Sequence, residues 1–222
     1  MIFRMRFIST LVLCAALLPL PAHAANPIAP QNVLYEMERD FYRLKIPTGK
    51  IDGIIDGKTQ RALCVWREMT NRLITRKLPT KSDIQAIAMT QDLFPTTAMA
   101  LGLNINLRCQ TAIWIREDVE TPYKIFPVSS GKTEFETILG TYNVGWLIDD
   151  WYESRTYPEG WMYRPQFFNK GQAIHGSIDD SMVQTYPASH GCVRMIQKDI
   201  DYLWDNNFGK NSLIHVYGSW IG

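Results

Sequence analysis

Residues 173–195 contain side chains that together could carry out nucleophilic catalysis. Two histidines, a cysteine and an arginine lie in this segment, namely His175, His190, Cys192 and Arg194. A cysteine attacks as its thiolate, so it needs a nearby base, and either histidine could accept its proton. An arginine can hold a carboxylate through a two-pronged contact. The segment therefore predicts a thiol nucleophile together with a base and a substrate-binding cation.

The glycine next to the cysteine fits the same chemistry. Attack by a thiolate on a carbonyl group builds negative charge on the oxygen, which backbone N–H groups can stabilise. Gly191 lets the backbone approach a substrate closely, whereas a β-branched residue would crowd that space. We therefore expect an oxyanion hole beside Cys192.

The spacing of these residues resembles the signature of the L,D-transpeptidase (YkuD-type) catalytic domain of bacterial cell-wall enzymes. That signature is a histidine, a spacer, and then Ser-His-Gly-Cys with a short tail. Here it reads His175-Gly176 followed by Ser189-His190-Gly191-Cys192-Val193-Arg194-Met195. The resemblance spans residues 104–218. The sequence departs from it at Thr137-Ile138-Leu139-Gly140, where many members have a proline after the threonine.

The resemblance implies a role for each residue of the central pair. Cys192 corresponds to the nucleophile, which forms a thioester with a donor peptide. His175 corresponds to the general base. The carbonyl group of Gly176 corresponds to the acceptor that fixes the tautomer of this histidine.

The other signature residues are implied to shape the site and to bind substrate. The backbone amides of His190 and Gly191, with that of Cys192, would line the oxyanion hole. Ser189 would support the loop, and Arg194 would grip a substrate carboxylate. His215 lies at strand spacing outside the signature, and we expect it to be an ordinary strand residue.

Two other classes of function use the same residues differently. His175, His190 and Cys192 could bind zinc, because imidazole and thiolate groups are zinc ligands. The sequence offers no obvious fourth ligand, and the resemblance implies neither a metal nor an organic cofactor. A non-catalytic wall-binding module would lack the nucleophile or the base, and both are present. We therefore expect a cysteine-dependent acyltransferase.

Short strands must position this segment. Glycine-bounded β-prone runs follow one another after residue 101, over residues 106–116, 123–128, 141–147, 172–175 and 213–217. A single helix is expected over residues 197–204. This pattern predicts a mostly β catalytic domain over residues 101–222, and the resemblance implies a YkuD-like β-sandwich with a short helix.

Aromatic residues crowd the segment 142–168, which is longer than a hairpin requires. They could form a loop that caps the site, excludes water and binds glycan or stem peptide. Alternatively, most of the rings belong to the core, and for any single ring we expect this second arrangement. The nine residues are Tyr142, Trp146, Trp151, Tyr152, Tyr157, Trp161, Tyr163, Phe167 and Phe168.

Residues 25–100 form a separate, helical part of the sequence. Apolar residues at helical spacing predict helices over residues 33–44 and 81–89, with another that starts near Thr59. The stretch IDGIIDGKTQRALCVW resembles the small helical peptidoglycan-binding domain often attached to such enzymes. The alternative is a packing domain that has lost ligand binding.

Residues 1–24 read as a signal peptide, which predicts export to the periplasm, the cell wall or the medium. This segment begins with basic residues, continues with an apolar run too short to span a bilayer, and ends with a small-x-small cleavage site. Export permits disulfides, and three cysteines remain after cleavage. Cys192 has a reason to stay free, so Cys64 and Cys109 could form a disulfide or remain two buried thiols.

Composition limits the partners of the mature chain. Of the 222 residues, 46% are hydrophobic and 20% are charged, which is a globular composition. Without Arg4 and Arg6, 21 basic residues face 22 acidic ones, so no basic field attracts nucleic acid. No later stretch predicts a transmembrane helix. We therefore expect peptidoglycan stem peptides and glycan as partners of an L,D-transpeptidase, with an L,D-carboxypeptidase as the alternative.

Overall fold

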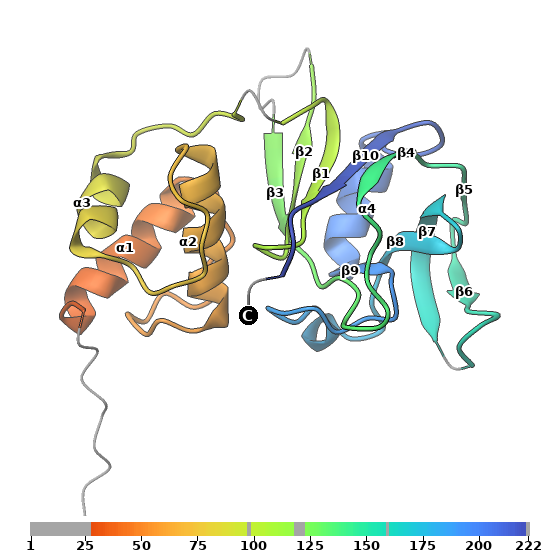
Figure 1. The fold of residues 1–222 in the computed structure, drawn as a ribbon, viewed down its shortest axis with the longest axis horizontal. Coiled ribbons are helices and arrows are strands. Elements are labelled where there is room, and N and C mark those ends of the chain that lie inside the picture. Colours follow the sequence, from red (N-terminus) through yellow and green to blue (C-terminus); the bar gives the residue numbers. More distant parts are fainter. Residues whose placement is uncertain (1–27, 97–98, 118–122, 159, 221–222) are drawn as a thin grey trace, which may run out of the picture.

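A helical region and a β-rich region lie side by side in the computed structural model (Figure 1). The structure describes residues 28–96, 99–117, 123–158 and 160–220. The expected signal peptide lies outside these residues. No helix in the described part of the chain is both long and apolar enough to cross a membrane.

Three helices make up the region before residue 100, namely α1 (Gln31–Arg43), α2 (Gly57–Met69) and α3 (Lys81–Met89). Helix α2 begins two residues before the expected Thr59, because the side chain of Asp56 accepts hydrogen bonds from the backbone N–H groups of Lys58 and Thr59. Helix α3 starts with a capping box between Thr80 and Asp83.

The first sheet of the β-rich region has five strands in the order β3-β2-β1-β10-β4. Their bounds are Tyr123–Pro127, Thr111–Ile115, Gly102–Asn106, Leu213–Tyr217 and Gly140–Asn143. The continuous strand expected over residues 106–116 is wrong. The chain turns there through Gln110, which has a φ of 55°, and β1 and β2 pair as an antiparallel hairpin.

The second sheet carries the signature residues. It has the order β5-β7-β8-β9, with bounds Trp146–Leu147, Trp161–Asn169, Gln172–Gly176 and Val193–Met195, and β6 (Trp151–Glu153) also pairs with β7. The run expected over residues 141–147 is split, because β4 and β5 belong to different sheets. A short 3₁₀ turn, η1 (Asp180–Met182), lies between β8 and β9.

One hydrophobic core joins the two sheets through helix α4 (Gln197–Asp205). It contains Leu103 and Phe126 from the first sheet, Ile174 and Val193 from the second, and Leu203 from the helix. The predicted fold class, a mostly β catalytic region with a short helix and a small helical region before it, is confirmed.

The helical region is fastened to the outer face of the first sheet. Ile113 of β2 and Ile125 of β3 belong to the same buried cluster as Trp66 of α2. A disulfide joins Cys64 of α2 to Cys109, with a Cα–Cα distance of 5.5 Å. The possible Cys64–Cys109 pairing is therefore confirmed, and it links helix to sheet across a shared apolar interface.

Candidate active site

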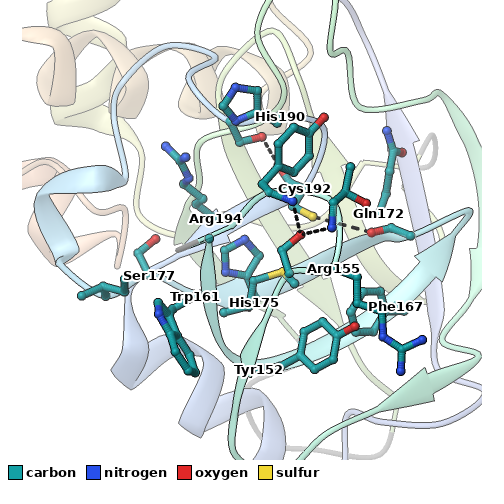
Figure 2. A pocket seen from close by; sticks show the side chains of 18 of the residues that line it. Tyr152, Arg155, Trp161, Phe167, Gln172, His175, Ser177, His190, Cys192 and Arg194 are labelled. Atoms are coloured by element: carbon teal, nitrogen blue, oxygen red, sulfur yellow. Dashed lines mark hydrogen bonds between the residues drawn. The ribbon is translucent and has the colours of Figure 1, made fainter.

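A two-stranded parallel ladder sets out the main side chains of the site. His175 of β8 lies opposite Arg194 of β9. Side chains two positions apart on a strand share a face, so Cys192 accompanies Arg194 and Ser177 accompanies His175. The pairing continues past β8, because the Ser177 N–H donates to the carbonyl oxygen of Met195 at 3.0 Å. All four side chains line one cavity of about 750 Å³ (Figure 2).

His175 is buried and oriented by its neighbour. Its Nδ1 lies 2.9 Å from the carbonyl oxygen of Gly176. A carbonyl oxygen only accepts hydrogen bonds, so Nδ1 carries the proton and Nε2 is left with a lone pair. Burial lowers the pKa of His175 to about 4; the hydrogen bond to Gly176 opposes this shift and the charge of Arg194 adds to it. The ring is therefore neutral at physiological pH and able to accept a proton.

Cys192 is the free cysteine of the described chain and is half-buried. Its Sγ lies 3.8 Å from the carbonyl oxygen of Gly171. Burial raises the pKa of this thiol, although the backbone at Ala173 and the charge of Arg194 act in the opposite direction. The resting site thus pairs a neutral thiol with a neutral imidazole, so the expected thiolate must form during the attack itself.

The loop before Cys192 is held by serine and glycine. Ser189 Oγ accepts a hydrogen bond from the backbone N–H of Gly191 at 3.1 Å, and it donates to the carbonyl oxygen of Cys192. Gly191 has a φ of 111°, a conformation that other residues rarely adopt. The N–H of Gly191 is used within the loop in this structure, and its expected contribution to an oxyanion hole stays a prediction.

Thr137, in the segment between β3 and β4, fastens the same loop, and this role was not predicted from the sequence. Its buried Oγ1 donates to the carbonyl oxygen of Gly191 at 2.9 Å and accepts from the N–H of Gly131 at 2.9 Å. Thr137 opens the stretch that lacks the family's proline. Its place in that pattern was the one signal that could have revealed it.

The ring of His190 packs against aromatic side chains above the pocket. Tyr157 stacks on it with ring centroids 4.6 Å apart, and Phe135 meets it edge-on at 4.9 Å. Both candidate bases line the cavity, but His175 is buried whereas His190 is exposed. Within the described part of the chain, no three His, Cys, Asp or Glu side chains are grouped to hold a metal ion.

Comparison with known proteins relates the region around the site to one family. Residues 103–208 match the YkuD family model, described as the L,D-transpeptidase catalytic domain. A crystal structure of an L,D-transpeptidase from Xylanimonas cellulosilytica is 25% identical, with a TM-score of 0.56 and a match covering 86% of this chain and 94% of that one. An L,D-transpeptidase (Yku) from Stackebrandtia nassauensis is 19% identical, with a TM-score of 0.54 and coverage of 85% and 92%, and shows the shared fold. The curated proteins contain no match.

Aromatic side chains form one wall of the pocket in this YkuD-like region. Five of the nine crowded rings line the cavity, namely Trp146, Tyr152, Tyr157, Trp161 and Phe167. The expectation that any single ring belongs to the core is wrong for the four exposed rings, Trp146, Trp151, Tyr157 and Trp161. Phe167 and Phe168 are buried, and Tyr142, Tyr152 and Tyr163 pack against buried clusters. Two of the five lining rings, Trp161 and Phe167, come from β7, a nine-residue strand that was not expected.

The charged residues around the pocket are all basic. Arg155, Lys170 and Arg194 line the cavity, and no aspartate or glutamate does so among the described residues. Arg155 and Arg194 lie on opposite sides of His175 and Cys192 (Figure 2). A chain with almost no net charge therefore has a pocket suited to an anionic substrate.

Proposed function

We propose that this protein is a peptidoglycan L,D-transpeptidase with Cys192 as its nucleophile. The observation that carries the proposal is the free, half-buried Cys192 beside a neutral, carbonyl-oriented His175 in a cavity within the YkuD match. A nucleophile, a base and a group that orients the base are the parts that acyl transfer to a thiol requires. The enzyme class of the matched family supports peptidoglycan as substrate.

The first half-reaction forms a thioester. Cys192 Sγ attacks the carbonyl carbon of the L-to-D peptide bond of a donor tetrapeptide stem while Nε2 of His175 accepts the thiol proton. The backbone N–H groups of His190 and Cys192, for which no acceptor is seen among the described residues, would stabilise the oxyanion. Collapse of the intermediate breaks the C–N bond, and His175 returns the proton to the departing amine of the terminal D-amino acid.

The second half-reaction transfers the acyl group. An amine of a second stem attacks the thioester carbonyl, His175 accepts its proton, and the thiol leaves as Cys192 regains a hydrogen. Water in place of the amine would give the L,D-carboxypeptidase reaction. The aromatic wall favours transfer, because rings from β6 and β7 pack with the thiol in an apolar cluster that includes Met162.

Export and wall attachment complete the proposal. A periplasmic or wall location agrees with the Cys64–Cys109 disulfide, since such bonds persist in oxidising compartments. The helical region is proposed to bring the enzyme to peptidoglycan, as its resemblance to a binding domain implies.

The test is incubation of residues 25–222 with purified disaccharide-tetrapeptide, followed by intact-mass and product analysis. We expect an adduct equal to the stem without its terminal residue, and a cross-linked dimer. Cys192→Ala should give neither, and His175→Gln should slow acylation by about 10²- to 10⁴-fold, the usual contribution of a general base. His215→Gln is the matched control, because that histidine bonds to Leu101 and Thr141 away from the cavity. Cross-links made by Cys192→Ala would refute the mechanism, and shortened stems alone would indicate hydrolysis.

A further inference from the structure

Gln172, at the start of β8, holds a neighbouring segment of the chain with both ends of its side-chain amide. Its Nε2 donates a hydrogen bond to the carbonyl oxygen of Glu136 at 2.9 Å, and its Oε1 accepts one from the N–H of Ile138 at 3.1 Å. The side chains of Ile138 and Leu139 are exposed, so their own packing does little to restrain this segment. Because one planar amide holds the backbone at two points, it fixes both the distance and the orientation of residues 136–138.

Thr137 lies between these two contacts and carries the restraint to the nucleophile loop. Its Oγ1 donates to the carbonyl oxygen of Gly191 at 2.9 Å, which ties residues 136–138 to the loop. Gln172 also approaches the loop directly, since a Cβ atom on Gly191 would lie 3.0 Å from its Nε2. Gln172 and Cys192 line the same cavity (Figure 2). The side chain of Gln172 therefore restrains the loop through Thr137 and by contact.

The peptide group that Thr137 holds is the one that carries the N–H of Cys192. The carbonyl group of Gly191 and this N–H belong to one planar peptide unit, in which the C=O and N–H bonds of the trans form point in opposite directions. Fixing the carbonyl oxygen on Thr137 therefore fixes the direction of the Cys192 N–H. That N–H has no acceptor among the described residues, as a donor reserved for an oxyanion requires.

We propose that Gln172 is a positioning residue for acylation, which aims the N–H of Cys192 at the oxyanion through Thr137 and Gly191. The proposal rests on the proposed function and adds a residue outside the signature to its first step. Ile138 takes part because its N–H is one of the two groups that Gln172 holds. A proline at this position, which the resemblance leads one to expect, would have no N–H to donate and would fix its own φ instead.

The experiment measures acylation of Cys192 by the tetrapeptide donor, with intact mass read at several donor concentrations. Gln172→Leu should lower kcat by about 10- to 100-fold, which is less than the loss of about 10²- to 10³-fold typical when an oxyanion donor is removed, because the N–H remains but is less well aimed. KM should change by less than about threefold, since the oxyanion forms only in the transition state. Alkylation of the free enzyme by iodoacetamide should also change by less than about threefold, because it has no oxyanion to stabilise.

Variants of Thr137 test the route by which Gln172 acts. Thr137→Val removes the hydroxyl and should lower kcat at least as far as Gln172→Leu, whereas Thr137→Ser keeps the hydroxyl and should restore most of that loss. Gln172→Leu added to Thr137→Val should change kcat little further, because groups that act through one network do not have additive effects.

Gln31→Leu is the matched control. Nε2 of Gln31 also donates to a backbone carbonyl oxygen, that of Asp52 at 2.9 Å, but Gln31 lies in α1 and outside the cavity. This variant loses the same kind of hydrogen bond, and it should keep the wild-type kcat and KM.

The outcomes separate the positioning role from the proposed function. A raised KM with an unchanged kcat would make Gln172 a substrate-binding residue, and additive losses in the double variant would disconnect it from Thr137. Faster alkylation of Gln172→Leu, by more than about threefold, would indicate a general loosening of the site. Each of these results would overturn the positioning role alone. A failure of the donor to acylate wild-type Cys192 would overturn the proposed function as well.

Discussion

The protonation state of the resting Cys192–His175 pair is a direct test of the site. Burial lowers the pKa of His175 from 6.5 to about 4 and raises that of Cys192 above its ordinary 9.0. The histidine shift corresponds to about 3 kcal/mol against a protonated ring in the folded protein. Both shifts disfavour a thiolate–imidazolium ion pair. We therefore expect a neutral pair at pH 7, unlike a cysteine enzyme whose thiolate is formed in advance.

Alkylation by iodoacetamide reports the thiolate in the absence of substrate. Its rate should rise steadily with pH and level off only above the ordinary thiol pKa of 9.0. It should show no plateau between about pH 5 and 8, the range in which an imidazolium partner would hold a thiolate. His175→Gln should change this alkylation rate at pH 7 by less than about threefold, although the same variant loses most acylation by the stem.

The pH dependence of acylation by the stem should instead follow the protonation of His175. Because His175 stays unprotonated above its pKa of about 4, the rate should hold down to about pH 5 and fall below it. The free energy of unfolding should also decrease as the pH falls. The histidine is protonated near pH 6.5 in the unfolded chain but only near pH 4 in the folded one, so the fold loses about 3 kcal/mol as the pH falls from 6.5 toward 4. Two results would refute a neutral resting pair. One is a plateau in the alkylation rate near neutral pH that disappears in His175→Gln, and the other is an acylation rate that already falls as the pH drops through about 6.5.

Two further predictions concern the scaffold. Replacing both cysteines of the Cys64–Cys109 disulfide with alanine should lower the free energy of unfolding in urea by about 4 kcal/mol, the entropy of closing a loop between residues 45 apart; a loss under about 1 kcal/mol would contradict this. Asp199→Asn should raise stability at pH 7.5 by up to about 3 kcal/mol, because burial raises the pKa of this carboxyl to about 6 and its Oδ2 has no partner in the described chain. The native state loses that stability as the pH rises through about 6, so thermal melts at pH 4 should show almost no gain. An equal gain at both pH values would show that charge is not the cause.

The sequence predicted those parts of the fold and site that depend on local pattern. Helix α3 and strand β10 begin and end where periodicity placed them, since each is bounded by clear breaks. His175 and Cys192 lie close in the sequence, so two adjacent strands were enough to bring them together. Strand β7 was missed because Pro165 and its mixture of rings and charges resemble a loop.

The supporting residues of the site could not be predicted from local pattern. Thr137 contacts Gly191 across 54 positions, and its place at the start of the Thr137–Gly140 stretch, the one signal in the sequence, does not reveal which residue it contacts. Ser177 stands out only because nothing satisfies its hydroxyl in three dimensions. Whether a polar group has a hydrogen-bond partner depends on long-range packing, so sequence periodicity cannot predict it.

The helical region also reaches the segment that leads into the nucleophile loop. Nη2 of Arg61, a buried residue of α2, donates to the carbonyl oxygen of Gln184 at 2.6 Å. At the start of the same helix, a Cβ atom on Gly57 would lie 2.4 Å from Oγ1 of Thr185, so a larger residue would require Thr185 to move. Gln184 and Thr185 precede Ser189 by a few residues, and Ser189 holds the loop around Cys192. Because the match to the Xylanimonas L,D-transpeptidase covers 86% of the chain, it also takes in helices from this region. The helices therefore form part of the scaffold on which the loop around Cys192 rests.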